Sequence, residues 1–154
     1  MNVQIRKGTP EDIPSIYALI HELAILERAE HELINTPEQL LADGFGERPA
    51  FEFLVVELGE EVVGMALYFY HYSTWKGKFL YLEDLIITQA QRGKGYGKAL
   101  LEALHEEALA HAANRIGWQV LDWNQPAIDF YRAMGAEIDA EWLNCRLWVK
   151  AKKT

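Results

Sequence analysis

The stretch Leu-Tyr-Leu-Glu-Asp-Leu-Ile-Ile-Thr-Gln-Ala-Gln-Arg-Gly-Lys-Gly-Tyr-Gly-Lys-Ala-Leu-Leu (residues 80–101) predicts a strand, a tight loop and a helix in direct succession. Its first part is apolar, β-branched and aromatic, and polar residues replace this run from Thr88 onward. Glycines then stand at positions 93, 95 and 97, and a helical pattern of Leu and Ala follows. The other elements can be placed outward from this strand, loop and helix.

The three glycines indicate a loop that binds an anion through its backbone. Without side chains, the N–H groups of the chain can approach a ligand closely. The first N–H groups of a helix have no partner inside the helix and lie at its positive dipole end, which suits phosphate. The loop lacks the spacing of a Rossmann fingerprint and of a Walker loop. For residues 92–97 alone, a plain glycine-rich turn remains the alternative.

The composition bounds the class of protein. A chain of 154 residues is expected to form one domain, 1–154, and to bury roughly two-thirds of its unfolded surface. Its formal net charge of −8 argues against a nucleic acid or a membrane as partner and favours a cationic one. The single cysteine, Cys145, allows no intrachain disulfide. The chain shows no apolar signal core and no run of about eighteen apolar residues, so a cytoplasmic location is expected.

Patterns along the chain predict strands and helices around the opening stretch. Alternation predicts a strand over 3–7, and the capping signals Thr9-Pro10-Glu11-Asp12 and Thr36-Pro37-Glu38-Gln39 each start a helix. A short helix is expected over 127–134. Further strand-like runs occupy 51–58, 62–72, 79–87, 115–122 and 138–149. The order is βααβββαβαβ, an α/β (α+β) arrangement.

The loop Arg92-Gly93-Lys94-Gly95-Tyr96-Gly97 resembles the Arg-x-x-Gly-x-Gly pyrophosphate loop of the GNAT acetyltransferases. In that family the loop follows a strand and holds the diphosphate of acetyl-CoA. The predicted order of elements matches the whole GNAT domain. The resemblance therefore implies a mixed, mostly antiparallel central sheet of about six to seven strands, flanked by about four helices.

Further motifs resemble the spermidine/spermine (diamine) N-acetyltransferase branch, which includes thialysine-acetylating relatives. They are Asp43-Gly44-Phe45-Gly46-Glu47-x-Pro49, Trp75-x-Gly77-Lys78, Tyr81-Leu82-Glu83-Asp84 and Trp123-Asn124-x-Pro126-x-x-x-Phe130-Tyr131. The resemblance implies direct acetyl transfer, in a ternary complex, from acetyl-CoA to a primary amine of a small cationic acceptor. Such an acceptor is a polyamine, a diamine or a thialysine-like amino acid.

The resemblance also assigns residues. Glu83 and Glu27 would face the substrate amine, with Trp75 and Asp84 completing the acceptor site, and Tyr131 would be the general acid. No metal site is expected. The residues expected to line acetyl-CoA are Leu85, Ile86, Ile87, Arg92, Gly93, Lys94, Gly95, Tyr96, Gly97, Lys98, Asn124, Gln125, Pro126, Ala127 and Phe130.

Glu83 and Asp84 interrupt the most strand-like run of the chain. Burying an uncompensated carboxylate is costly, so each acid is expected to have a bonding partner, to be exposed in a cleft, or to serve the function of the protein. Neighbouring residues of a regular strand point to opposite faces, which would give the two acids different roles. Attack by an amine requires its neutral form, whereas a free alkylammonium has a pKa of about 10.4, and a carboxylate can take its proton. Glu83 is the candidate for this task, and a structural acid is the alternative.

Two other groups of residues carry a chemical and a structural interpretation. The hydroxyl of Tyr131 can protonate a leaving thiolate, or its ring can simply pack with the hydroxyl satisfied. Asn124 can bond the pantetheine arm of acetyl-CoA or only cap its helix. The amides of residues 85–87 can pair with that arm if the strand splays or bulges. Four tryptophans are expected in the core or at an interface: Trp118, Trp123, Trp142 and Trp148.

Two departures from the branch concern the acceptor. Ser73-Thr74-Trp75 stands where the branch usually has Asp-Pro-Trp, and Glu141-Trp142-Leu143 stands where it carries a paired acid. Fewer carboxylates weaken the hold on a long polycation, which makes a small amine at least as good an acceptor. A homodimer is expected by resemblance and because the last strand leaves a sheet edge to cover. The alternatives are a non-catalytic acyl-CoA-binding regulatory module and a protein N-terminal or lysine acetyltransferase.

Overall fold

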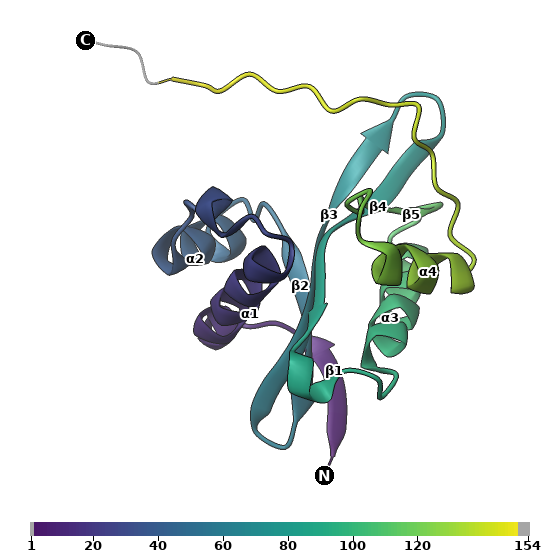
Figure 1. Ribbon diagram of the computed structural model, residues 1–154. Coiled ribbons are helices and arrows are strands. Elements are labelled where there is room, and N and C mark those ends of the chain that lie inside the picture. Colours follow the sequence, from purple (N-terminus) through teal and green to yellow (C-terminus); the bar gives the residue numbers. More distant parts are fainter. Residues whose placement is uncertain (1, 151–154) are drawn as a thin grey trace. The chain divides into compact units, whose positions relative to one another are not determined.

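The computed structural model describes residues 2–150, and the chain divides into two compact units between Leu121 and Asp122. The described part of the first unit contains a five-stranded sheet with helices on both faces (Figure 1). The second unit contains a helix followed by extended chain. The mixed α/β fold class predicted from the sequence is confirmed, with fewer strands than expected.

The sheet has the strand order β1-β2-β3-β4-β5. Neighbouring strands are antiparallel from β1 to β4, and β4 and β5 are parallel. The strands are β1 (Val3–Lys7), β2 (Glu52–Leu58), β3 (Glu61–Ser73), β4 (Gly77–Ile87) and β5 (Ile116–Gly117). The long central strands β3 and β4 are therefore the scaffold on which the first unit is built.

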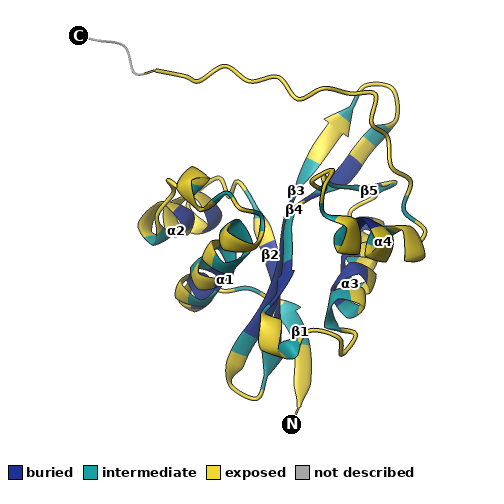
Figure 2. Ribbon diagram, in the orientation of Figure 1, coloured by how far each residue is buried: buried dark blue, intermediate teal, exposed yellow. Residues whose placement is uncertain are grey.

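Helices cover both faces of this sheet. Helices α1 (Ile13–Leu26) and α2 (Pro37–Phe45) lie on one face, and α3 (Tyr96–Ala110) lies on the other (Figure 1). Short 3₁₀ turns η1 (Pro10–Asp12), η2 (Glu30–Glu32) and η3 (Gln89–Gln91) join these elements. Figure 2 shows the buried residues along the strands and on the inner sides of the helices. The core on the α1 and α2 face consists of Ile13, Ile16, Leu19, Leu40, Phe53, Val55, Met65, Leu67 and Ile86.

Both predicted capping signals form as expected. The Thr9 N–H donates to Asp12 Oδ2 at 2.8 Å before α1, and the Gln39 N–H donates to Thr36 Oγ1 at 3.1 Å at the start of α2. These bonds satisfy backbone donors that a helix leaves open at its first turn. The local sequence therefore determines where each of these helices begins.

Two predictions about the end of the sheet are wrong. The strand expected over 115–122 shortens to β5, which pairs with β4 only at Leu80 and Tyr81. The strand expected over 138–149 does not form, and all of these residues are exposed (Figure 2). A strand needs a neighbouring strand to bond its backbone groups, and no pairing with another described strand exists for this segment.

Candidate functional site

A β-bulge lies in β4 at the two acids. Leu67 of β3 pairs with Asp84, whereas the next β3 residue, Tyr68, pairs with Leu82. Glu83 is thus an extra residue with no counterpart on β3. A bulge of this kind disrupts the ladder locally and re-aims side chains. The sequence analysis placed a possible bulge at residues 85–87, and the structure has it just before them.

The bulge changes which β4 side chains share a face. Phe69 pairs with Tyr81, and Leu67 pairs with Asp84. Phe69 and Leu67 are two residues apart and so point to the same face of the sheet, and their cross-strand partners follow them. Leu67 belongs to the core under α1 and α2, so Tyr81 and Asp84 both face that side. The different roles expected for the two acids applied to a regular strand, and the extra residue resets the alternation at this point.

Two further carboxylates, those of Glu83 and Glu27, lie close enough to Asp84 to influence it. Burial, together with the charges of Glu83 and Glu27, raises the pKa of Asp84 to about 7. Glu27 is the C-cap residue of α1, and burial raises its pKa as well. Burial and the charges of Glu83 and Asp84 raise the pKa of Tyr81. We call Glu27, Glu83 and Asp84 the acidic cluster; it contains three of the four residues predicted to bind the acceptor.

The acidic cluster has two chemical capacities. The carboxylates attract a cation electrostatically, and Glu83 is exposed to solvent. A carboxyl group with a pKa near 7 can accept a proton near neutral pH and release it again. Trp75, the fourth predicted acceptor residue, lies in the turn between β3 and β4 and is 84 % exposed.

The glycine loop presents its backbone to open space. Gly93 has φ +78° and Gly95, the N-cap of α3, has φ +85°, a region that residues with a Cβ rarely adopt. A Cβ built at either position would meet nothing within 4 Å. The Ala99 N–H donates to the Gly95 carbonyl at 3.0 Å, so the N–H groups of residues 96–98 precede the helical ladder. This geometry fits an anion held by main-chain donors.

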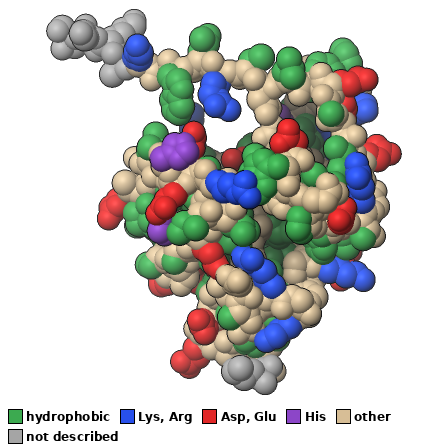
Figure 3. Space-filling view, viewed as in Figure 1, with side chains coloured by type: hydrophobic (Ala, Val, Ile, Leu, Met, Phe, Trp, Pro, Cys, Tyr) green, Lys and Arg blue, Asp and Glu red, His purple; other side chains and the backbone are tan. Residues whose placement is uncertain are grey.

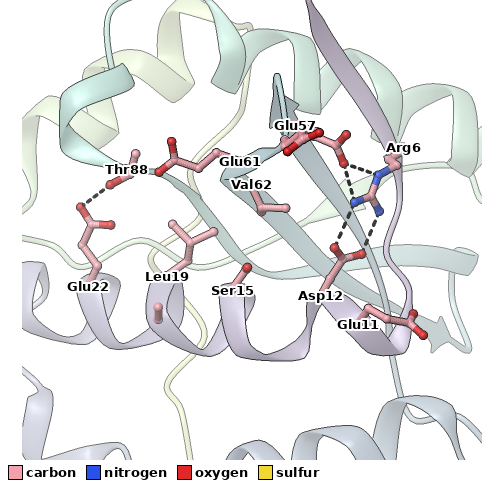
Figure 4. Close-up of a pocket in the computed structure, with 12 residues that line it drawn as sticks. Arg6, Glu11, Asp12, Ser15, Leu19, Glu22, Glu57, Glu61, Val62 and Thr88 are labelled. Carbon is pink, nitrogen blue, oxygen red and sulfur yellow. Dashed lines mark hydrogen bonds and ion pairs between the residues drawn. The ribbon is translucent and has the colours of Figure 1, made fainter.

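Side chains fasten this loop to α1 and β4. Glu22 Oε1 of α1 accepts from Thr88 Oγ1 at 3.2 Å (Figure 4) and from the Gln89 N–H at 3.0 Å. Arg92 donates from Nε to the Ile87 carbonyl at 2.8 Å, and its Nη2 lies 3.8 Å from Glu22 Oε1. Arg92 was predicted to line acetyl-CoA, and here it holds the start of the loop against the end of β4. The sequence analysis missed Glu22.

The end of β4 has no β5 strand beside it. The pairing of the two strands stops at Tyr81 and Gly117, and β4 continues to Ile87. This separation is the splay that the sequence analysis required for residues 85–87 to offer backbone groups to a ligand. The carbonyl of Ile87 is already used by Arg92.

The second unit carries the other predicted site residues. In α4 (Gln125–Ala133), Asn124 Oδ1 accepts from the Ala127 N–H at 3.3 Å, so Asn124 caps this helix. The ring of the half-buried Tyr131 lies 5.5 Å from the ring of Phe130, measured between centroids. The acidic cluster and the glycine loop belong to the first unit, whereas Tyr131 belongs to the second.

A separate pocket of about 530 Å³ lies beside α1 and the β2–β3 hairpin (Figure 4). At one end, Arg6 Nη1 lies 2.8 Å from Asp12 Oδ2, and Arg6 Nη2 lies 2.6 Å from Glu57 Oε2. The hydrogen bonds from Arg6 hold the pKa of Asp12 below its usual value. None of the predicted site residues lines this pocket, which is therefore distinct from the acidic cluster.

Two properties of residues 2–150 bear on the class of site. No group of three or more His, Cys, Asp or Glu side chains in this range is placed to hold a metal ion. No helix in this range is long and apolar enough to cross a membrane.

Comparisons with known proteins place this geometry in a family. Residues 15–136 match the model of the acetyltransferase (GNAT) family. Thialysine N-epsilon-acetyltransferase of Bos taurus is 39 % identical over 153 residues, which cover 93 % of this chain and 90 % of the bovine protein. L-ornithine N5-acetyltransferase NATA1 of Arabidopsis thaliana is 31 % identical over 190 residues, covering 94 % of this chain and 83 % of the plant protein.

The fold is also found among solved structures. An integron cassette protein from the mobile metagenome of V. cholerae superposes with a TM-score of 0.79 at 23 % identity, covering 97 % of this chain and 94 % of that one. The chain belongs to the GNAT acetyltransferase family. It is an N-acetyltransferase, and the resemblance to the branch with thialysine-acetylating members is confirmed.

Proposed function

We propose that this protein transfers an acetyl group from acetyl-CoA to a primary amine of a small cationic acceptor, a polyamine, a diamine or a thialysine-like amino acid. The observation that carries the proposal is the bulge in β4, which brings Asp84 to the α1 face beside Glu83 and Glu27. Relatives named for thialysine and ornithine, both small amines, support this class of acceptor.

The acidic cluster acts on the amine. The exposed carboxylate of Glu83 attracts the ammonium group, and a carboxyl of the cluster then takes its proton so that the neutral amine can attack. Asp84 is suited to share this task with Glu83, because its pKa is raised to about 7. A short amine is at least as good an acceptor as a long polyamine, because Ser73 and Glu141-Trp142-Leu143 stand where the branch has acids that would hold a longer polycation.

The glycine loop and the end of β4 hold acetyl-CoA, whose thioester supplies the activated acetyl group. The open space over Gly93 and Gly95 and the N–H groups of residues 96–98 suit its diphosphate. Lys94 and Lys98 add positive charge at the same place. Backbone groups of residues 85–87 pair with the pantetheine arm, and residues 124–127 and Phe130 line it.

Tyr131 completes the reaction as the general acid. Its hydroxyl gives a proton to the departing sulfur of CoA, which makes the thiol the leaving group. Tyr131 is half-buried on α4 and packs against Phe130, so its ring position is constrained.

Three further properties belong to the proposal. Both units form one GNAT domain, which the family match supports because it spans residues 15–136 across their boundary. The protein works in the cytoplasm, without nucleic acid or membrane partners. It functions as a homodimer.

A screen of amines tests the proposal. Purified protein is given acetyl-CoA with thialysine, lysine, ornithine, short diamines, spermidine or spermine, and release of the CoA thiol is followed. We expect release with the short diamines and diamino acids, at a kcat/KM at least equal to that for spermidine. Binding of acetyl-CoA without thiol release on any amine would contradict the proposal.

A further inference from the structure

Glu22 of α1 binds the residues that lead into the glycine loop through a single carboxylate oxygen. Its Oε1 accepts from the Thr88 hydroxyl at 3.2 Å, as Figure 4 shows, and from the Gln89 N–H at 3.0 Å. The Nη2 atom of Arg92 lies 3.8 Å from the same oxygen. A carboxylate suits this position, because each of its oxygens accepts several bonds and its charge strengthens them.

The helix that carries Glu22 is fixed against the sheet. Ile16 and Leu19 of α1 are buried in the core, where they belong to the same cluster as Met65 of β3 and Ile86 of β4. Packing of this kind leaves a helix little freedom to shift. The Glu22 carboxylate, one turn beyond Leu19, is therefore held at a set position beside the end of β4.

The turn η3 is tied at both of its ends. Thr88, its N-cap residue, makes no side-chain cap bond, and Glu22 caps the turn instead by accepting from the first amide, that of Gln89. Directly after the turn, Arg92 donates from Nε to the Ile87 carbonyl at 2.8 Å. The chain thus enters the glycine loop from a turn that is bound to α1 and to β4.

The glycine loop itself has little else to hold it. A Cβ built at Gly93 or Gly95 would meet nothing within 4 Å, and glycine gives the backbone more freedom than any other residue. Figure 3 shows Lys and Arg side chains over this part of the chain, where the sequence has Arg92, Lys94 and Lys98. Like charges repel, so such a loop depends on the anchors at its ends when no anion is bound.

We propose that Glu22 is a positioning residue for acetyl-CoA, which sets the glycine loop for the diphosphate before the ligand arrives. The inference rests on the proposed function, because that function assigns the loop to this diphosphate. A loop that is already ordered loses less conformational entropy on binding, which raises affinity. Glu22 therefore acts on the binding of acetyl-CoA and leaves the chemistry at the acidic cluster unchanged.

A first experiment measures CoA affinity by calorimetric titration without an amine. Glu22→Ala should raise the dissociation constant at least about tenfold, because two hydrogen bonds to a charged acceptor are lost. Glu22→Gln should stay within about threefold of the wild type, since its amide oxygen can accept from the same two donors and only the charge toward Arg92 is lost. Glu11→Ala is the control, because Glu11 is exposed and lines the same pocket as Glu22.

Wild-type affinity in Glu22→Ala, or a loss in Glu22→Gln as large as that in Glu22→Ala, would overturn the inference. The titration requires no turnover, so it stands apart from the amine screen. A wild-type protein that binds CoA but releases no thiol from acetyl-CoA on any amine would contradict the proposed function alone.

A second experiment compares two acetyl donors. Acetylpantetheine carries the same thioester and arm as acetyl-CoA but has no diphosphate. In Glu22→Ala we expect kcat/KM for acetyl-CoA to fall about tenfold through KM, with kcat and the KM for the amine nearly constant. With acetylpantetheine the variant should match the wild type. A general structural fault would lower the rates with both donors alike, so equal losses, or a loss in kcat alone, would overturn the inference.

Discussion

In the proposed mechanism, the acidic cluster and the glycine loop recognise their ligands by opposite means. Glu27, Glu83 and Asp84 act through side chains, and their effect depends on charge and burial. Gly93 and Gly95 act by lacking side chains, and the loop depends on space and backbone conformation. A change of charge without a change of shape should therefore disable the first, whereas added volume should disable the second. The contributions of the two regions can be measured separately with substitutions that alter either charge or volume alone.

The largest effect is expected from Asp84→Asn, which keeps the shape and removes the charge. We expect kcat/KM for the amine to fall about 10³-fold, as for a positioned proton acceptor, with little change in the affinity for acetyl-CoA. The wild-type rate at limiting amine should rise with pH through about 7, the pKa of Asp84, and this dependence should disappear in the variant. Steady-state kinetics over pH 5.5 to about 9 measure both.

Glu102→Gln serves as the control for that variant, because Glu102 is an exposed acid on α3 on the opposite face of the sheet. Its kinetics should match those of the wild type. Wild-type kinetics in Asp84→Asn would leave Asp84 with a structural role.

Tyr131→Phe tests whether the acetyl-CoA side of the site, which we call the donor side, also uses a side chain. Loss of the hydroxyl should lower kcat roughly 10²-fold with little change in acetyl-CoA affinity, because a positioned acid is removed while the ring remains. Tyr72→Phe is the matched control, since Tyr72 is 68 % exposed. Unchanged kcat in Tyr131→Phe would remove Tyr131 from the mechanism and leave the donor side to the backbone alone.

Gly95→Val tests the donor side by adding a side chain to the glycine loop. We expect the dissociation constant for CoA to rise about tenfold or more, because the side chain occupies the open space over the loop and opposes the positive φ. Calorimetric titration with CoA measures it. Gly59→Val, at another positive-φ glycine in the β2–β3 turn (φ +64°), controls for backbone strain alone. Intact CoA affinity in Gly95→Val would make the loop a connector only.

Glu83→Gln should have a smaller effect, confined to the acceptor. Because Glu83 is exposed, solvent screens its charge, and we expect the KM for the amine to rise about fivefold while that for acetyl-CoA stays nearly constant. The reverse pattern would assign Glu83 to the donor side. The difference between this variant and Asp84→Asn sharpens the division of tasks within the acidic cluster.

The smallest effect concerns stability. The pKa of Asp84 is raised above its usual value in the folded chain, so ionisation disfavours folding, and this penalty is absent below about pH 4 and grows up to about pH 7. Asp84→Asn should therefore be more stable than the wild type at pH 8, by about 2 kcal/mol, with a gain that shrinks on acidification. Urea unfolding at pH 4 and pH 8 measures the difference. Equal gains at both values would contradict the raised pKa.

The sequence predicted the elements whose signals are local. The caps at Thr9 and Thr36, the glycine loop and the helix after it follow from nearby residues alone. The shared face of Tyr81 and Asp84 could not be predicted, because it depends on the register between β3 and β4.

Other features depend on contacts between distant parts of the chain. Glu22 hydrogen-bonds to Thr88 and Gln89, which follow it in the chain by 66 and 67 positions. Arg6 hydrogen-bonds to Glu57, which follows it by 51 positions. Neither contact leaves a local pattern in the sequence. For residues 138–149 the strand pattern is present in the sequence, but a pattern cannot supply the neighbouring strand that a ladder requires.

The extra residue in β4 gives this strand a position at which its length can change without a change of faces. Removing Glu83 would leave the pairings of Tyr81 with Phe69, Leu82 with Tyr68 and Asp84 with Leu67 as they are, because Glu83 has no counterpart on β3. Tyr81 and Asp84 would still share a face, and the strand would lose the bulge and one exposed carboxylate. Losing any other residue of β4 would instead shift the register by one and turn the side chains beyond it to the opposite face.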